Sequence, residues 1–403
     1  MNTTTGTSPD DLRARMVDLI AAKNYLHSGR VEEAMRTVPR HLFLPAATVE
    51  EAYAERSVTT KPGSNGGRPL SCASQPSVVA MMLERLDARP GDRILEIGAG
   101  TGYNAALLAE LVGETGEVTT VDICPEVTVQ ARQALDANGY GRVHVATQDG
   151  ALGEADHAPY DRIIVTVGPW DLPPTWLDQL APGGRLVVPL CWRGQARSIA
   201  FTHEGNHLRS DDVQLCGFIP MLGQDGERTG TIDTDGHVAL YWDIDQPIDP
   251  AVLTGVLSQP KTTVWSGATV GSGESFDGVW LRLTGAEPGT CRIAADPPAV
   301  DAGLATPAIP SRSPALVEGT SLAYFTLRPL DPDATERRWE LGATGHGPTG
   351  PQLAGRLCEQ IRAWDRDRTA QPLITAYPAG TPDQGLPNGQ VIDKRHIRLV
   401  VSS

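Results

Sequence analysis

The segment Arg93-Ile-Leu-Glu-Ile-Gly-Ala-Gly-Thr-Gly-Tyr103 is the most informative part of this 403-residue sequence. An apolar run ends in a turn that carries Gly98, Gly100 and Gly102, and a helical pattern begins near Tyr103. Glycine accepts positive φ and has no Cβ, so the backbone can turn sharply from a strand into a helix and come close to a ligand. The free amide groups at the start of that helix face the same turn. The segment therefore predicts a site for a cofactor that contains a nucleoside.

Strands and helices alternate after this turn. The next predicted strand ends in Asp122, whose carboxylate can accept hydrogen bonds from both ribose hydroxyl groups, and a third strand leads into Asp149-Gly150. This alternation predicts an α/β fold with a Rossmann-like, doubly wound parallel sheet and helices on both faces. The alternative is that the glycines only pack a helix against a strand. The predicted elements are strands at residues 116–121, 143–146 and 161–167 and helices at residues 78–86 and 125–138.

In their order along the chain, these positions resemble the S-adenosylmethionine-dependent methyltransferases. NAD-binding sheets use a related turn, but with Gly-x-Gly-x-x-Gly spacing, and here the third glycine comes one residue early. The resemblance implies S-adenosylmethionine as the cofactor, and no metal ligand is expected. The candidate cofactor-binding residues are Glu96, Gly98, Gly100, Gly102, Asp122, Ile123, Asp149 and Gly150.

Five further segments occur in order along the chain. They are Val38-Pro-Arg-His-Leu-Phe-Leu-Pro45, Ser71-Cys-Ala-Ser-Gln-Pro-Ser-Val-Val-Ala80, Tyr160-Asp-Arg-Ile-Ile-Val-Thr-Val-Gly-Pro169, Leu180-Ala-Pro-Gly-Gly-Arg-Leu-Val-Val-Pro189 and Phe218-Ile-Pro220. Together they carry a closer resemblance, to the protein-L-isoaspartate O-methyltransferase family, over roughly residues 10–225. This resemblance implies an enzyme of EC class 2.1.1 that moves a methyl group from a sulfonium to a carboxylate.

Ser74 matches the serine that lies beside the substrate carboxylate in that family. The resemblance therefore implies a catalytic role for Ser74 and a substrate contact for Ser74 and Gln75. The alternative from the residues alone is that Ser74 caps the helix that follows. No general base is needed, because a carboxylate is already ionised at neutral pH. The histidines His41, His144 and His157 are accordingly interpreted as ordinary surface or core residues.

The chain continues beyond the family-like region to residue 403. We expect a catalytic domain at residues 1–225, a linker at residues 226–236 and a smaller α+β accessory domain at residues 237–403. Residues 286–316 are rich in Pro, Ala and Ser and are expected to be irregular. The apolar stripe of the predicted 350–365 helix is interpreted as domain core rather than as a partner groove. Strand-like runs occur at residues 237–242, 279–283, 322–328 and 397–401.

Long forms of this methyltransferase resemble enzymes associated with ribosomally synthesised modified peptides, including lanthipeptides and graspetides. That resemblance implies methylation of one aspartate in a macrocyclic precursor peptide, leading through a methyl ester to aspartimide or isoaspartate. The accessory domain would then hold the peptide. The alternative is a repair methyltransferase for isoaspartate in damaged proteins. A third hypothesis is a binding or sensor protein that keeps the cofactor fold without turnover.

The composition limits the classes of partner and the compartment that we expect for this chain. A net charge of −15 disfavours general binding to nucleic acids or anionic membranes. The six cysteines show no Cys-x-x-Cys pair and no zinc-site spacing, so free thiols in a reducing compartment are expected. Residues 1–10 are polar and lack the apolar core of a signal peptide, and no apolar run of membrane-spanning length occurs. The sequence therefore predicts a cytoplasmic enzyme whose partner is a peptide or protein that bears aspartate or isoaspartate.

Overall fold

The computed structural model describes residues 7–63, 69–331 and 334–402. Residues 1–6 of the polar N-terminal segment thus lie outside the described part of the chain. The chain divides into two compact units. Unit 1 contains residues 1–190 and 197–222, and unit 2 contains residues 191–196 and 223–403.

The predicted boundary at residue 225 is close to the observed one, but the predicted linker at residues 226–236 is wrong. Five of its eleven residues form a strand, β10 (Glu227–Thr231), which pairs antiparallel with β11 (Val238–Asp243) at the edge of a sheet. An edge strand needs no apolar face, and four of the five β10 residues are exposed. A polar edge strand and a polar linker therefore look alike in sequence.

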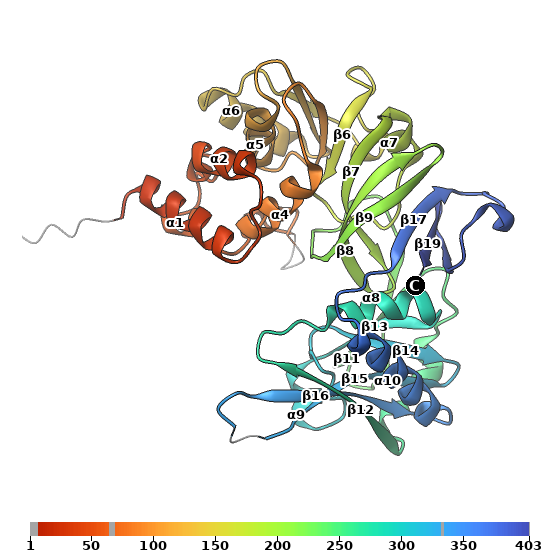
Figure 1. Ribbon diagram of the computed structural model, residues 1–403. Helices are drawn as coiled ribbons and strands as arrows, with labels where there is room; N and C mark the ends of the chain where they lie inside the picture. Colours follow the sequence, from red (N-terminus) through yellow and green to blue (C-terminus); the bar gives the residue numbers. More distant parts are fainter. Residues whose placement is uncertain (1–6, 64–68, 332–333, 403) are drawn as a thin grey trace, which may run out of the picture. The chain divides into compact units, whose positions relative to one another are not determined.

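Unit 1 is built on a sheet with the strand order β9-β8-β7-β6-β3-β4-β5 (Figure 1). Strand β3 pairs in parallel with β4 on one side and with β6 on the other. The winding therefore changes direction at β3, where ligands bind in open α/β sheets. The strands are β3 (Arg93–Ile97), β4 (Glu117–Asp122), β5 (His144–Thr147), β6 (Tyr160–Val165), β7 (Leu180–Trp192), β8 (Gln195–Glu204) and β9 (His207–Leu215). The predicted α/β class, its parallel strands and the alternation of helices with strands are confirmed.

The helices of unit 1 begin where the sequence signals indicate. Pro125 opens α6 and Pro76 opens α4. Helix α5 follows the glycine turn directly, and eight of its ten residues are buried, as befits a helix that supports the sheet. A short hairpin of β1 (Val58–Lys61) and β2 (Ser71–Ala73) precedes α4. The helices are α1 (Pro9–Ala22), α2 (Gly29–Thr37), α3 (Val49–Tyr53), α4 (Pro76–Leu86), α5 (Tyr103–Val112), α6 (Pro125–Ala137) and α7 (Pro174–Gln179).

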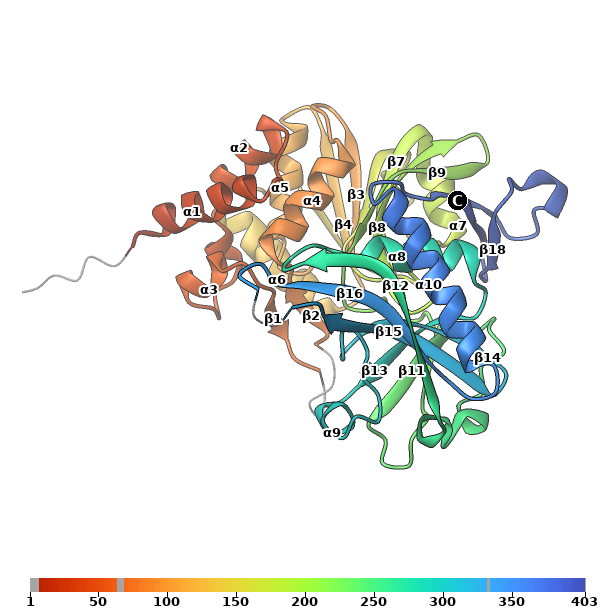
Figure 2. The ribbon, with the colours of Figure 1, turned by 60° about the horizontal axis from the view of Figure 1, so that its bottom comes forward.

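Unit 2 is an antiparallel sheet with the strand order β10-β11-β13-β14-β15-β16-β12. Helix α10 (Gly350–Arg366) packs across β12, β15 and β16 (Figure 2). The other elements are β12 (Lys261–Gly271), α8 (Asp277–Ala286), β13 (Thr290–Ala295), α9 (Pro297–Asp301), β14 (Ser313–Glu318), β15 (Ser321–Pro329), β16 (Arg338–His346), β17 (Leu373–Pro378), β18 (Gln390–Asp393) and β19 (Ile397–Ser402). Strand β19 pairs antiparallel with both β17 and β18.

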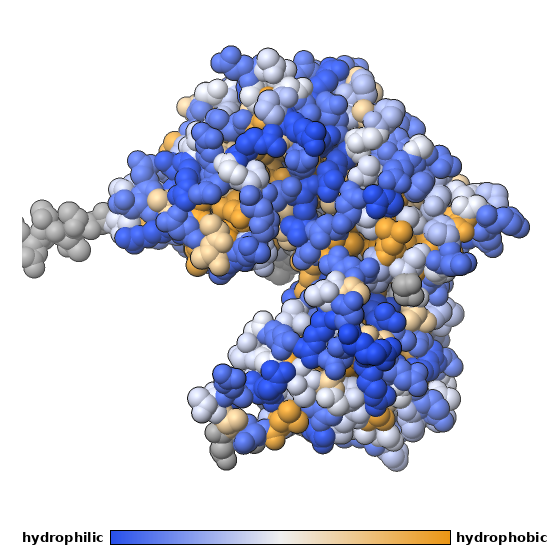
Figure 3. Space-filling model, in the orientation of Figure 1, coloured by the Kyte–Doolittle hydropathy of each residue, from blue (hydrophilic) through white to orange (hydrophobic). Residues whose placement is uncertain are grey.

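The predicted stripe of α10 is core. Leu353, Leu357, Ile361 and Trp364 are buried in one cluster with residues of α8, β15 and β16. A second cluster joins residues of β11, β13 and β14 to the segments around Leu253. The apolar residues are thus concentrated inside, and Figure 3 shows a mostly hydrophilic surface on the face drawn.

Two predictions for unit 2 are wrong. Residues 279–283 lie in helix α8 rather than in a strand, because a short apolar run does not distinguish a buried helix from a buried strand. Residues 286–316 include β13, α9 and part of β14 and are therefore not an irregular connection. All six cysteines are free thiols, as predicted. Among the described helices, none is both long enough and apolar enough to cross a bilayer.

Candidate active site

The glycine turn after β3 has the geometry that its sequence predicts. Gly98, Gly100 and Gly102 have φ values of +103°, +52° and +81°. A Cβ on Gly98 would lie 2.5 Å from Thr166 Oγ1, whereas a Cβ on Gly100 would meet no atom within 4 Å. The turn is therefore packed tightly beneath Gly98 and open above Gly100. The open side is where a ligand can approach the backbone.

Asp122 closes the turn from the end of β4. Its Oδ2 accepts a hydrogen bond from the Gly100 amide at 3.2 Å, and its Oδ1 accepts one from the Cys124 amide at 3.0 Å. The side chain is only half-buried. The carboxylate is therefore held in place by two main-chain groups and still has lone pairs for further donors.

Glu96 is placed differently from its prediction. Its side chain is completely buried, and its two oxygens accept hydrogen bonds from Asn104 Nδ2 at 2.7 Å and Thr120 Oγ1 at 2.6 Å. Burial raises the pKa of Glu96 to about 7, although both hydrogen bonds act to lower it. Glu96 thus lies beneath the turn and fixes the start of α5. In this buried position the Glu96 side chain does not reach a cofactor directly.

The third predicted segment lies after β5. Asp149 caps a short 3-10 helix, with its Oδ1 accepting from the Ala151 amide at 2.9 Å. Gly150 is buried, and a Cβ there would lie 2.6 Å from Ile97 Cγ2, so glycine is needed for packing. Ile123, by contrast, is 47% exposed directly after Asp122, which leaves an apolar surface beside the carboxylate. Such a surface suits the face of an adenine ring.

Ser74 lies between β2 and α4. The residue at the N-cap of α4 is Gln75, and it makes no side-chain cap hydrogen bond. The alternative role of Ser74 as a helix cap is therefore wrong. Gln75 Nε2 donates to Glu55 Oε1 at 2.7 Å and to Ser77 Oγ at 3.0 Å, so its amide hydrogens serve the internal network of this loop.

Arg40 supports the loop that contains Ser74, although the sequence alone predicts no role for it. Its side chain is 1% exposed, and it donates to the carbonyl oxygens of Ala52 and Ser74, each at 2.8 Å. Its guanidinium carbon also lies 5.0 Å from the centre of the Tyr103 ring. Burial lowers the pKa of Arg40. One buried cation thus joins α3, the Ser74 loop and the first residue of α5.

Three polar atoms in this region have no hydrogen-bond partner within the described residues. They are Arg40 Nη1, Glu55 Oε2 and the Tyr103 hydroxyl, all buried. Unpaired buried polar atoms are rare in native proteins and usually mark water or a ligand. The buried side chains beside the Ser74 loop are therefore partly polar.

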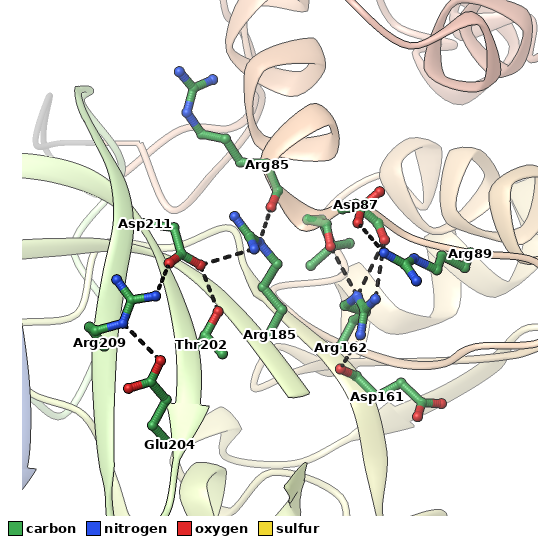
Figure 4. Close-up of polar contacts among 11 residues, drawn as sticks. Arg85, Asp87, Arg89, Asp161, Arg162, Arg185, Thr202, Glu204, Arg209 and Asp211 are labelled. Atoms are coloured by element: carbon green, nitrogen blue, oxygen red, sulfur yellow. Dashed lines mark hydrogen bonds and ion pairs between the residues drawn. The ribbon is translucent and has the colours of Figure 1, made fainter. Parts of the chain in front are cut away.

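The far end of α4 is also fixed. Arg162 Nε donates to the Leu86 carbonyl at 3.1 Å, and Arg185 donates to the Arg85 carbonyl and to Asp211, 3.1 Å away (Figure 4). These side chains come from β6 and β7 and satisfy the carbonyl groups at the end of the helix. The helix that follows Ser74 is therefore anchored to the sheet at its other end.

Comparison with known proteins identifies the family. The family model described as protein-L-isoaspartate(D-aspartate) O-methyltransferase matches residues 12–226. A protein-L-isoaspartate O-methyltransferase of Methanopyrus kandleri is 41% identical over 216 residues, which are 53% of this chain and 92% of that protein. Protein-L-isoaspartate O-methyltransferase 2 of Archaeoglobus fulgidus is 37% identical over 56% of this chain and 99% of its own length. This chain belongs to the protein-L-isoaspartate O-methyltransferase family.

The enzyme is accordingly an S-adenosylmethionine-dependent carboxyl O-methyltransferase. The turn fits that cofactor, because Gly100 leaves open space above the backbone and Asp122 presents a fixed carboxylate beside it. On this basis Gly98, Gly100, Gly102 and Asp122 would hold the cofactor, with Ile123 and Asp149 at the edges of the site. The cofactor supplies an electrophilic methyl group.

The second unit also has a parallel among solved structures. A protein-L-isoaspartate O-methyltransferase structure matches with a TM-score of 0.50 and 20% identity, covering 90% of this chain and 96% of that chain. At this identity the likeness is one of fold alone. Because it covers 90% of this chain, it extends well beyond residue 226 into unit 2. A second unit of this kind therefore occurs in another structure that carries the family's name.

Proposed function

We propose that this enzyme methylates the free carboxylate of L-isoaspartyl residues in damaged proteins and thereby starts their repair. The observation that carries this proposal is the match of residues 12–226 to a family whose curated relatives are aligned over nearly their whole length. The likeness of fold over both units adds support, because it removes the need for a special substrate to explain unit 2.

Ser74 is the proposed substrate contact. Its carbonyl is fixed by Arg40 and the neighbouring Gln75 side chain is held by Glu55, so the loop position is set before substrate binds. The hydroxyl of Ser74 can then donate to one carboxylate oxygen and leave the other aimed at the methyl carbon. Orientation of this kind accelerates methyl transfer, because the reacting atoms must be aligned for displacement.

Proton transfer is not required. The substrate carboxylate is ionised at neutral pH, and its oxygen forms the new O–C bond as the S–C bond breaks. The positive charge of the sulfonium and the negative charge of the carboxylate cancel in this step, so partial exclusion of water favours it.

The product is a methyl ester. Attack by the neighbouring backbone nitrogen on the ester carbonyl releases methanol and closes a succinimide. Hydrolysis of the ring then gives either aspartate or isoaspartate, and repeated cycles convert isoaspartate into aspartate. The chain need supply only the ester.

Methylation of an aspartate in a macrocyclic precursor peptide is the competing function. The resemblance of long forms of this methyltransferase to enzymes of modified peptides favours it, and the likeness of fold over unit 2 weakens that reason. The two functions differ in substrate, so one experiment separates them. The full chain is incubated with S-adenosylmethionine and either a linear isoaspartyl peptide or a cyclised aspartate-bearing precursor, and the mass of each peptide is followed.

Repair predicts that only the isoaspartyl peptide gains a methyl group, which mild alkali releases as methanol. Methylation of the cyclised precursor with no reaction of the isoaspartyl peptide would overturn the proposal in favour of peptide tailoring. No methylation of either peptide by a chain that binds S-adenosylhomocysteine would favour the sensor hypothesis.

A further inference from the structure

A second cluster of chemically active side chains lies away from the Ser74 loop. His144, Glu154 and His157 come together in unit 1, with one possible ligand atom from each residue within 4.8 Å of the others. His144 begins the edge strand β5, whereas Glu154 and His157 lie in the loop before β6. From the sequence alone, both histidines are interpreted as ordinary residues and no metal ligand is expected. We propose that these three residues form a binding site for one divalent ion of the zinc class.

The three side chains offer the types of donor atom that zinc binds. Two imidazoles and one carboxylate are ligands that Zn²⁺ uses in proteins, with a further position left for water. Two ligand atoms on one tetrahedral zinc lie about 3.3 Å apart, given Zn–N bonds of about 2.0–2.1 Å. The three ligand atoms lie within 4.8 Å of one another, so the exposed His144 side chain would have to move toward the other two to complete a tetrahedral site.

The carboxylate is fixed in advance. Glu154 is 8% exposed, its amide donates to Gln179 Oε1 at 2.9 Å, and its carbonyl accepts from the Tyr160 hydroxyl at 2.7 Å. Its Oε2 lies 2.6 Å from His157 Nδ1. A carboxylate that orients one ring nitrogen of a histidine leaves the other nitrogen aimed outward for a metal. Glu154 therefore serves the site either as a direct ligand or as the group that orients His157.

The two rings already face one another. The centres of the His144 and His157 rings are 4.3 Å apart, with an angle of 34° between their planes. Both line an open surface hollow of about 490 Å³. Arg132 and Arg142 line it as well and oppose a cation, but they also donate to the main-chain carbonyls of Tyr140 and Gly116.

The proposed site is remote from the cofactor turn. On the ladder between β4 and β5, His144 pairs with Thr119 at one end and Thr147 pairs with Asp122 at the other. The ion would therefore tie the edge strand to the loop before β6 and stabilise unit 1 without contacting the reacting groups. Binding that is confined to the folded state raises the unfolding temperature.

The test uses the untagged, metal-stripped full chain and ZnCl₂ as the probe. Calorimetric titration should show one bound ion per chain that His144→Ala and His157→Ala each weaken at least tenfold. His27→Ala, a change of an exposed histidine elsewhere in unit 1, is the matched control and should bind like the parent. Because three cysteines are partly exposed and thiols also bind zinc, the comparison between variants decides the result.

Thermal unfolding gives an independent readout. Zn²⁺ should raise the unfolding temperature of the parent and of His27→Ala, but not that of His144→Ala, while the affinity for S-adenosylhomocysteine stays the same in all three. His144 is exposed, so its replacement should not unfold the chain. Equal zinc affinity in the parent and in His144→Ala would overturn the proposal, as would a parent chain that binds no zinc at 100 times its own concentration.

Discussion

Arg40 Nη2 donates a hydrogen bond of 2.8 Å to the carbonyl oxygen of Ser74, and this contact links a buried cation to the proposed substrate loop. The same side chain donates to the carbonyl oxygen of Ala52, so it also links the loop to α3. The bond reaches the main chain of Ser74 rather than its hydroxyl. In the proposed function Arg40 is therefore a positioning residue, which leaves the Ser74 hydroxyl for the substrate.

Arg40→Lys should impair both stability and turnover. Lysine keeps the charge but lacks the planar fork that serves two carbonyl groups at once. Leaving a buried carbonyl without its partner costs about 1–3 kcal/mol. We expect a loss of that size in the free energy of unfolding and a lower kcat for an isoaspartyl peptide. Arg56→Lys, at an exposed ion pair with Glu51, is the control and should change neither; equal behaviour of the two variants would contradict the assignment.

Ser74→Ala should lower kcat/KM for an isoaspartyl peptide by about tenfold to a hundredfold, the range expected for loss of one hydrogen bond to a charged group. The structure shows no helix-capping role for Ser74, so the unfolding temperature of Ser74→Ala should equal that of the parent. Affinity for S-adenosylhomocysteine, measured by calorimetry, should also hold. Parallel loss of cofactor affinity and turnover would show that the loop, rather than the hydroxyl, was damaged.

Asp122→Asn should weaken S-adenosylhomocysteine binding by about tenfold or more, because a hydrogen bond to a charged acceptor contributes about 1.5–3 kcal/mol. The change keeps the size of the side chain, but an amide nitrogen cannot accept, so one of the two main-chain hydrogen bonds to Asp122 is lost as well. Asp136→Asn removes a carboxylate that pairs with Arg132 on α6 and is the matched control. Calorimetric titration of the parent and both variants measures the effect, and three equal affinities would refute the ribose role of Asp122.

Glu96 predicts a pH dependence of stability. Its pKa is raised from 4.5 to about 7 in the folded state, so the native chain binds more protons than the unfolded chain between these values. Stability contributed by this residue is therefore fully present below pH 4.5 and is lost as the pH rises to 7. The loss amounts to about 3 kcal/mol.

Glu96→Gln removes this titration. The free energy of unfolding of the parent, relative to that of Glu96→Gln, should fall by about 3 kcal/mol between pH 4.5 and pH 7. Denaturant unfolding of both chains over that range measures the difference, and contributions from all other carboxylates cancel. A difference that does not change with pH would show that Glu96 titrates normally.

Asp243→Ala should destabilise unit 2 by about 1–3 kcal/mol, because it leaves the buried Arg193 amide without its acceptor, while the Arg193 guanidinium keeps its pair with Asp245. Arg193 and Asp243 have side chains 4% and 1% exposed, and the Arg193 amide donates to Asp243 Oδ2 at 2.9 Å. Asp383 pairs with Arg398 but is 84% exposed, so Asp383→Ala should cost less than about 1 kcal/mol. Denaturant unfolding compares the two variants, and similar losses would contradict the structural role of the buried pair.

Strong periodicity and turn chemistry made much of unit 1 predictable. The glycine turn, the end of β4 at Asp122 and the proline that opens α6 are local signals, and the structure places each as expected. The prediction for Glu96 differed from its observed position because the sequence does not show which side of a turn a carboxylate occupies. Burial of Glu96 depends on Thr120 and Asn104, which lie on other elements.

Contacts between distant segments were the less predictable part. Arg40 lies within a recognised motif, but its partners are main-chain carbonyls, and carbonyl groups carry no sequence signal. His144 and His157 meet only because β5 and the loop before β6 lie at the same edge of unit 1. In unit 2, the strand β10 is polar and the helix α8 is short and apolar, so local pattern misassigned both.

The most direct measurement for the central claim is kcat/KM for two peptides of identical sequence, one with an L-isoaspartyl residue and one with L-aspartate at the same position. The proposed function predicts methylation of the isoaspartyl peptide with a kcat/KM at least a hundredfold higher, and loss of that rate in Ser74→Ala with cofactor affinity retained. Equal rates for the two peptides, or a preference for aspartate, would contradict it.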